Sequence, residues 1–187
     1  MEIIYRLIAH TDPAISQIEQ LYTSAFPADE RRDFCDFLSL LADEESVFAV
    51  MGAFDAGDES RLLAFITFWD FGTIMYLEHF AVIPQMRGHG IGTTVFTHFL
   101  GNIASTIVLE VEPPETQVAI KRIKFYEALG LKLWPQFHYV QPPYSPDKNE
   151  LELKLMTHGN VTLPMLENAV EEIYDNVYGR RPARSAE

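Results

Sequence analysis

A glycine-rich segment at residues 85–92 is the part of this sequence with the clearest chemical use. Gln85-Met86-Arg87-Gly88-His89-Gly90-Ile91-Gly92 follows an extended apolar run and precedes a stretch that can form a helix. Small residues leave the turn with little side-chain bulk, so successive backbone N–H groups can converge at the positive end of the helix dipole. Such a turn binds phosphate, and Arg87 can add formal charge. The sequence therefore predicts a phosphate-bearing ligand at residues 87–93.

Two common phosphate-binding motifs do not fit this segment. The dinucleotide fingerprint needs Gly-x-Gly-x-x-Gly, whereas the glycines here fall at every second residue. A P-loop ends in Gly-Lys-Ser/Thr, and the sequence has no lysine between Arg61 and Lys121. Both nucleotide-binding classes are therefore set aside.

Glu78 is the second chemical feature, because it interrupts the apolar run from Ile74 to Ile83. A carboxylate in a covered strand costs free energy unless it is partnered or functional. Strand alternation predicts that Glu78 shares a face with Phe80 and Val82 and that His79 points to the opposite face.

The elements that position these residues follow from periodicity and turn signals. We expect a mixed, mostly antiparallel α/β sheet with helices on both faces. Asp12-Pro13 suits a helix start, and Gly130 suits a left-handed helix end. Strands are predicted at residues 3–8, 47–54, 62–69, 74–83, 106–112, 131–140 and 151–156, and helices from about 13, 34, 91 and 115.

An additional C-terminal helix is predicted over residues 163–178, with one apolar stripe. The stripe favours docking on its own domain, and a homodimer contact is the alternative. Residues 1–179 are predicted to form a single domain, and residues 180–187 a mobile tail.

With these residues in place, the chain resembles the GNAT superfamily of N-acetyltransferases over residues 47–156. Their coenzyme A loop, Gln/Arg-x-x-Gly-x-Gly/Ala, is matched by Gln85, Gly88 and Gly90 after Val82-Ile83-Pro84. A second match is Phe125-Tyr126 followed by Gly130-Leu131, similar to the Phe-Tyr-x-x-x-Gly-Phe of that family. The two matches occur in the family's order, with a predicted strand between them.

The resemblance implies acetyl-CoA as cosubstrate and assigns two sets of residues to it. In GNAT proteins the pantetheine arm pairs with the strand before the loop, which here assigns the main chain of Phe80, Ala81 and Val82. By the same resemblance, these main-chain groups would also face the thioester carbonyl. The pyrophosphate is assigned to the loop, whose residues are Arg87, Gly88, His89, Gly90, Ile91, Gly92 and Thr93.

Tyr126 is the general acid that the resemblance implies for the leaving thiolate. A phenol with an unperturbed pKa of about 10 stays protonated near neutrality and can donate to sulfur. A core tyrosine with a satisfied hydroxyl is the alternative. Many relatives carry Asn and Ala seven and four residues earlier, where this chain has Ala119 and Arg122. Arg122 could instead reach a phosphate.

Glu78 is the candidate general base, directly or through water, and a structural hydrogen-bonding role is its alternative. Glu110 and Glu112 on the next strand could form an acidic amine pocket instead. The acceptor pocket is expected at Phe26 to Arg31 and at Tyr139 to Tyr144, segments that commonly line it in this family.

The amino-acid composition limits the classes of partner that we expect. A formal net charge of −13 argues against nucleic acid and anionic membranes and suits a cationic amine. The sequence shows no membrane-length apolar run, no signal peptide and no metal-binding motif, so we expect a cytoplasmic protein without a metal. Cys35 is the one cysteine, which suits a reducing compartment, and its apolar helical pattern predicts burial.

The resulting hypothesis is an N-acetyltransferase that moves acetyl from acetyl-CoA directly to a primary amine of a small molecule or peptide. A coenzyme A-binding sensor or structural module without turnover is the alternative from another class. Transfer of a longer acyl chain is a third.

Overall fold

The computed structural model describes residues 1–179, so the predicted tail at 180–187 lies outside the described residues. Contacts divide the described chain into two compact units. The first contains Met1–Asp70 and Leu77–Ala104, and the second contains Phe71–Tyr76 and the chain from Ser105 onward. The prediction of a single domain over 1–179 stays a prediction.

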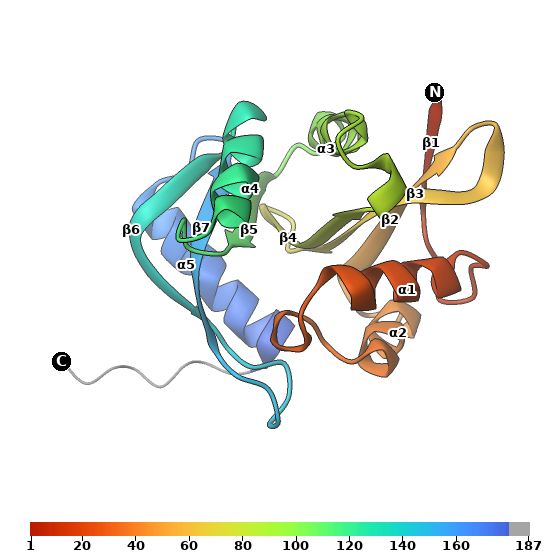
Figure 1. The fold of residues 1–187 in the computed structure, drawn as a ribbon. Helices are drawn as coiled ribbons and strands as arrows, with labels where there is room; N and C mark the ends of the chain where they lie inside the picture. The colour runs from red at the N-terminus through yellow and green to blue at the C-terminus, as the bar shows by residue number, and fades with distance from the viewer. Residues whose placement is uncertain (180–187) are drawn as a thin grey trace. The chain divides into compact units, whose positions relative to one another are not determined.

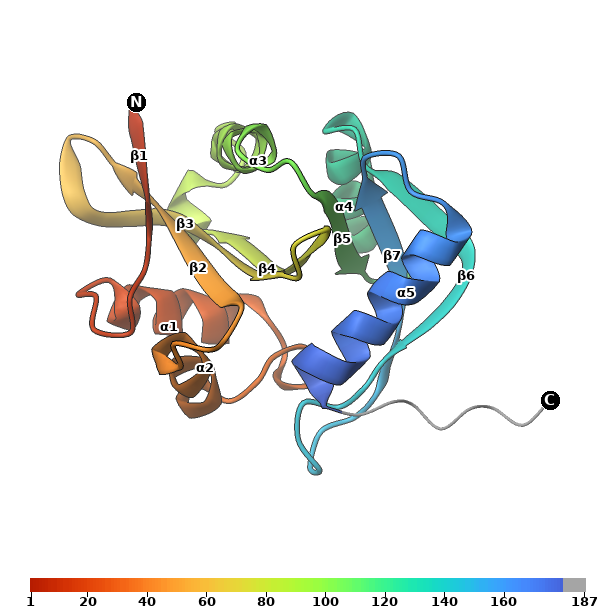
Figure 2. The same ribbon diagram turned by 180° about the vertical axis from the view of Figure 1, so that it is seen from behind.

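The first unit is an antiparallel sheet covered on both faces. It contains β1 (Ile3–Leu7), β2 (Phe48–Asp55), β3 (Asp58–Asp70) and Leu77–Val82 of β4 (Ile74–Val82), in the order β1-β2-β3-β4. Ile3 pairs with Asp55 and Phe48 pairs with Trp69. Helices α1 (Ile15–Ala25) and α2 (Phe34–Ala42) cover one face and α3 (Ile91–Gly101) covers the other (Figures 1 and 2). The short turns η1 (Ala28–Glu30) and η2 (Pro84–Met86) precede α2 and α3.

Aromatic contacts identify which helix each of two neighbouring β3 residues faces. Trp69 packs on Phe48, which packs on Phe37 of α2. Phe68, its neighbour on β3, packs on Phe99 of α3, as strand alternation requires.

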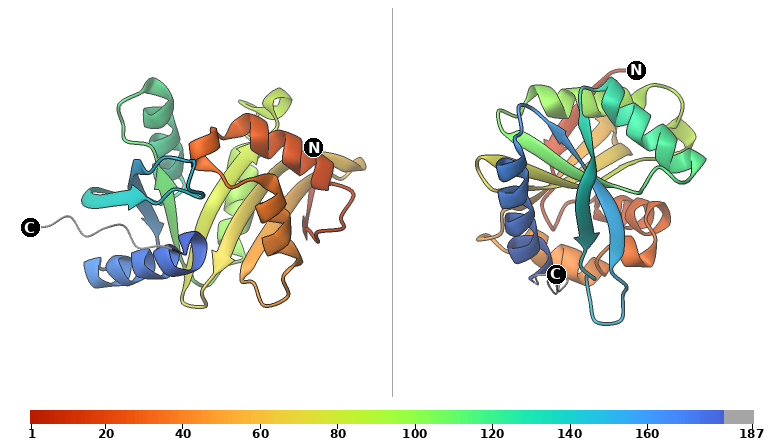
Figure 3. Two further views of the ribbon diagram at one scale, coloured as in Figure 1. Left: turned by 90° about the horizontal axis from the view of Figure 1, so that it is seen from below. Right: turned by 90° about the vertical axis from the view of Figure 1, so that its left-hand side faces the viewer.

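The second unit is a smaller antiparallel sheet. It contains β5 (Thr106–Val111), β6 (Lys132–Gln141) and β7 (Leu151–His158), in the order β5-β7-β6. Helices α4 (Gln117–Ala128) and α5 (Leu163–Ile173) lie on opposite faces of these strands (Figure 3, right). A π-helical turn, η3 (Tyr174–Tyr178), continues α5 to the end of the predicted C-terminal helix.

The structure confirms the predicted fold class, with mixed α/β units, antiparallel strand pairing and helices on both sheet faces. Gly130 ends α4 with φ +89° as predicted. The predicted start of α1 was two residues too early: the N-cap is Ala14, and Asp12 accepts the Ala14 N–H instead. Cys35 is exposed and not buried, because α2 turns other residues toward the sheet. None of the helices in residues 1–179 has the length and apolarity to cross a bilayer.

Candidate functional site

The glycine loop connects the end of β4 to α3. Gly88 and Gly90 have φ +78° and +80°, in the left-handed region that favours glycine. A Cβ added at either position would meet no atom within 4 Å, so the outer side of the turn is open. The loop therefore has the space at its backbone that the sequence predicted for an approaching ligand.

The start of α3 supplies the backbone donors. Gly90 is the N-cap, and the helical bonds begin with the Thr94 N–H to the Gly90 carbonyl at 3.0 Å. By helix geometry, the N–H groups of Ile91, Gly92 and Thr93 have no partner within α3. These groups lie at the positive end of the helix dipole, so the turn can bind an anion.

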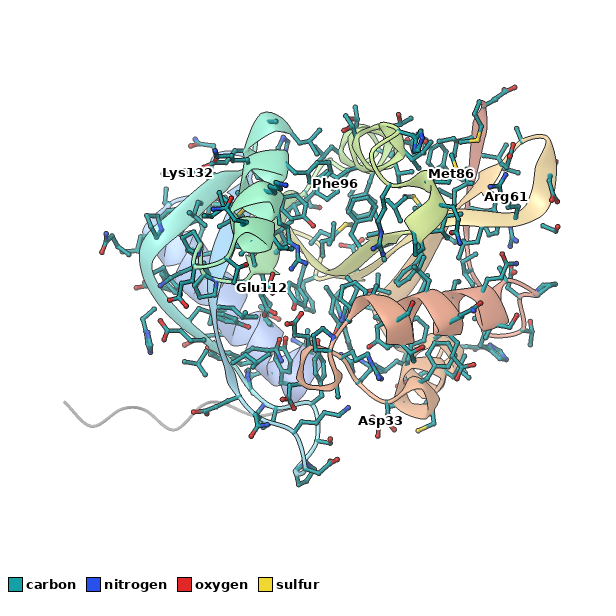
Figure 4. The ribbon with its side chains drawn as sticks, viewed as in Figure 1. Asp33, Arg61, Met86, Phe96, Glu112 and Lys132 are labelled. Atoms are coloured by element: carbon teal, nitrogen blue, oxygen red, sulfur yellow. The ribbon has the colours of Figure 1, made fainter. Side chains whose placement is uncertain are left out.

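Arg87 and His89 are exposed on the loop, and their side chains order it. The Arg87 Nε donates to the Val82 carbonyl at 3.0 Å, which holds the guanidinium at the end of β4. The His89 Nδ1 lies 2.9 Å from the Arg87 carbonyl. At the base of the loop, Arg61 Nη2 lies 3.9 Å from Met86 Sδ, and both residues are labelled in Figure 4.

Glu78 lies in a buried ion pair, with its side chain 1% exposed. Arg32 Nη2 donates to Glu78 Oε1 at 2.5 Å, and Trp69 Nε1 donates to Oε2 at 3.0 Å. Burial raises the pKa of this carboxyl, but the Arg32 charge and these hydrogen bonds outweigh burial and lower it. The carboxylate is therefore ionised at neutral pH, with both oxygens accepting hydrogen bonds.

His79, the next residue, is also buried and contacts the segment that contains Glu30 and Arg32. Its Nε2 lies 2.9 Å from the Glu30 carbonyl, and its Nδ1 lies 3.2 Å from Thr67 Oγ1. A carbonyl only accepts, so Nε2 carries the proton and the neutral ring accepts at Nδ1. Burial lowers the pKa of His79 despite the opposing effect of Glu78, which keeps the ring neutral near pH 7.

The predicted alternation of side chains along β4 was wrong at these two residues. Glu78 contacts Trp69 and His79 contacts Thr67, two positions that share one face of β3. Accordingly, Glu78 Oε2 and His79 Nδ1 are 3.8 Å apart. Phe80 instead packs on Phe96, the α3 residue labelled in Figure 4, so Glu78 and Phe80 lie on opposite faces. Two adjacent side chains of β4 therefore have polar partners on one face of the sheet.

The acidic alternatives on and after β5 are also hydrogen-bonded. Glu110 accepts hydrogen bonds from the hydroxyls of Tyr139 and Tyr178, the latter at 3.2 Å. Glu112 Oε2 pairs with Arg122 Nη1 at 2.5 Å. The Arg122 charge, for which a phosphate contact was one option, is thus engaged with a carboxylate of the same unit.

Tyr126 lies on α4 in the second unit and is 7% exposed. Burial raises its pKa to about 12, although the nearby Arg122 acts in the opposite direction. Its hydroxyl is therefore protonated throughout the neutral range. Its main chain also accepts the Leu131 N–H, which closes the helix end at Gly130.

The structure thus joins some of the predicted site residues and leaves others apart. The loop, Phe80 to Val82 and Glu78 are all in the first unit, whereas Tyr126 is in the second.

Sequence reasoning missed Arg32, which lies outside any motif. The signal was Glu78, since a carboxylate in an apolar strand requires a hydrogen-bond donor. Within residues 1–179, no group of three or more His, Cys, Asp or Glu side chains could hold a metal ion.

Comparison with known proteins identifies a protein family whose model matches this chain. The model of the GNAT acetyltransferase family matches residues 13–131. A solved structure from Bacteroides thetaiotaomicron, assigned to the GNAT family, is 32% identical with a TM-score of 0.86, over 95% of this chain and 99% of that chain. Among curated proteins, no sequence matches this chain significantly.

Two further solved structures share the fold at lower identity. The ribosomal-protein-S18-alanine N-acetyltransferase from Escherichia coli is 21% identical with a TM-score of 0.60, over 87% of this chain and 97% of that one. Arabidopsis thaliana NAA60, in complex with acetyl-CoA, is 17% identical with a TM-score of 0.61, over 84% and 98%. At these identities the likeness concerns the fold alone.

Proposed function

The chain belongs to the GNAT family of acetyltransferases, and on that premise we propose that it is an acetyl-CoA-dependent N-acetyltransferase. It moves the acetyl group directly to a primary amine of a small molecule or a peptide. The observation that carries this proposal is the turn at Gly88 and Gly90, which is open on its outer side and precedes the free donors of α3.

The residues present fit the cosubstrate. The loop from Arg87 to Thr93 would hold the pyrophosphate through backbone N–H groups, and the main chain of Phe80, Ala81 and Val82 would hold the pantetheine arm. Phe80 and Val82 are partly exposed, which is compatible with this role, while Ala81 is buried between them. When bound, acetyl-CoA supplies an activated acyl thioester.

Tyr126 is the proposed donor to the leaving sulfur. With a pKa of about 12, its hydroxyl stays protonated at neutral pH. A thiol has a pKa of about 8.5, so complete transfer to a thiolate from this phenol is uphill by about 3.5 pKa units. The hydroxyl therefore contributes as a hydrogen-bond donor while negative charge develops on sulfur, and full protonation follows from solvent.

Deprotonation of the amine has two proposed routes. Glu78 is the base that the sequence predicts, and a carboxylate elsewhere or a water molecule is the alternative. Two features favour the alternative: both Glu78 oxygens already accept hydrogen bonds, and its lowered pKa makes it a weak proton acceptor. The base role of Glu78 stays a prediction, tested by the pH–rate profile described in the Discussion.

The acceptor is proposed as a class and not as a compound. Among proteins of similar fold, one is named for the alanine of ribosomal protein S18 and another for spermidine, so the fold serves both peptide and small amines. The net charge of −13 supports a cationic acceptor. A cytoplasmic location is part of the proposal, and α5 is the surface to test for a homodimer.

One experiment separates the enzyme from a binding module. Calorimetry measures acetyl-CoA binding, and thiol release is then followed with polyamines, arylalkylamines, aminoglycosides, amino acids and peptides. Binding together with thiol release from at least one amine supports the proposal. Binding without release from any amine favours the coenzyme A sensor, and failure to bind would refute both.

A further inference from the structure

Arg32 and Glu30 hold two adjacent residues of β4 from one short segment. The Arg32 guanidinium holds Glu78, and the Glu30 carbonyl holds His79. The segment is fixed in turn, since the Arg32 N–H donates to Tyr22 Oη of α1 at 3.0 Å. The contacts therefore join α1, the turn before α2 and β4.

These contacts hold two adjacent side chains of β4 on one face. In a regular strand Glu78 and His79 would point to opposite faces, yet both reach the face lined by Thr67 and Trp69. The break falls directly before Phe80, whose side chain is on the α3 face. The main chain at residues 78–80 must therefore depart from regular pairing geometry, as in a β-bulge.

The solvent exposure of Glu78 and Phe80 shows which part of β4 is accessible. The Glu78 side chain is 1% exposed, yet the residue as a whole is partly exposed. Its exposed surface is therefore main chain. Residue 80, the next partly exposed position, is the first of the three residues proposed above to hold the pantetheine arm.

We propose that Arg32 is a positioning residue for acyl transfer: through its ion pair with Glu78 it fixes the β4 main chain that receives the thioester end of the cosubstrate. This inference rests on the proposed function. It assigns the Glu78 charge to holding the strand, and it adds a residue that no sequence motif contains.

The test compares two ligands that differ only at the thioester. In the full chain, Arg32→Gln should weaken acetyl-CoA binding at least fivefold by calorimetry and change coenzyme A binding less than twofold, because the pyrophosphate loop is untouched. Arg32→Lys keeps the cation and should recover part of the loss. Arg6→Gln is the matched control, since Arg6 pairs with Asp12 in the same unit and away from β4; both affinities should stay unchanged.

Tryptophan fluorescence follows the strand without any ligand. The chain has two tryptophans, so Trp134→Phe leaves Trp69, whose Nε1 donates to Glu78. Adding Arg32→Gln should shift the Trp69 emission, and adding Arg6→Gln should not. Unchanged affinities, or equal losses for both ligands, would overturn the positioning role. If the wild type binds neither ligand, the proposed function fails, and this inference fails with it.

Discussion

Gly90→Val tests the cofactor loop with a magnitude that the structure sets. At φ +80° a β-branched residue is strained, and left-handed backbone costs L-residues about 1–2 kcal/mol. An added Cβ meets no atom within 4 Å beyond its chain neighbours, so no Cβ clash adds to this cost. Its methyl groups instead occupy the open side of the turn. Losing one charge-assisted hydrogen bond is worth about 1.5–3 kcal/mol, so acetyl-CoA affinity should fall at least tenfold, or about 1.4 kcal/mol.

Gly72→Val separates strain from ligand exclusion. Gly72 has φ +85° and the same free space around a Cβ, but it lies in the turn before β4 and outside the loop. Both variants should lose similar stability in urea unfolding, and calorimetry should show weaker cosubstrate binding for Gly90→Val alone. Equal affinity in wild type and Gly90→Val would refute the loop assignment. An equal loss in Gly72→Val would show that strain, and not the site, is being measured.

Three further outcomes are expected. Tyr126→Phe should keep acetyl-CoA affinity and lower kcat, by up to the roughly 10²–10⁴-fold typical of general acid catalysis; unchanged turnover would assign Tyr126 to packing. If Glu78 is the base, Glu78→Gln should lower the rate most near neutral pH and recover partly at alkaline pH, whereas an unchanged profile shape in a folded variant would reject that role. The lowered pKa of Glu78 stabilises the fold above its unfolded pKa of about 4.3, and this stability is lost as pH falls through the folded pKa. At pH 7 Glu78→Gln should therefore cost about 3–5 kcal/mol by breaking the buried ion pair with Arg32, and the difference from wild type in urea unfolding should narrow near pH 3.

Local signals were sufficient to predict the elements of this fold. The glycine loop, the helix that follows it and the left-handed Gly130 each follow from backbone restrictions that act within a few residues. Periodicity located the strands for the same reason, because one face of each must be covered. The start of α1 was misplaced because Asp12, two residues before the N-cap, bonds the N–H of the N-cap residue Ala14 in a local turn.

The arrangement of polar groups around β4 could not be predicted in this way. Arg32 and Glu78 are separated by 46 residues, and their pairing depends on how the turn before α2 packs on the sheet. Strand alternation placed Glu78 beside Phe80, because the rule assumes a regular strand. The rule failed where two adjacent side chains both found partners on one face, which sequence spacing does not encode.

The Arg32–Glu78 ion pair accounts for a charged residue in a strand that is covered on both faces. An acid in such a strand is costly, so either catalysis or a partner must account for it. A buried pair need not add stability over apolar residues, but removing one partner is strongly destabilising. Its clearest consequence is therefore geometric: it fixes Glu78 on one face and leaves Phe80 on the other. A charge that holds strand geometry in this way is compatible with catalysis in which another group or water removes the amine proton. The acetyl-CoA and coenzyme A affinities of Arg32→Gln, together with the pH–rate profile of Glu78→Gln, decide between these roles.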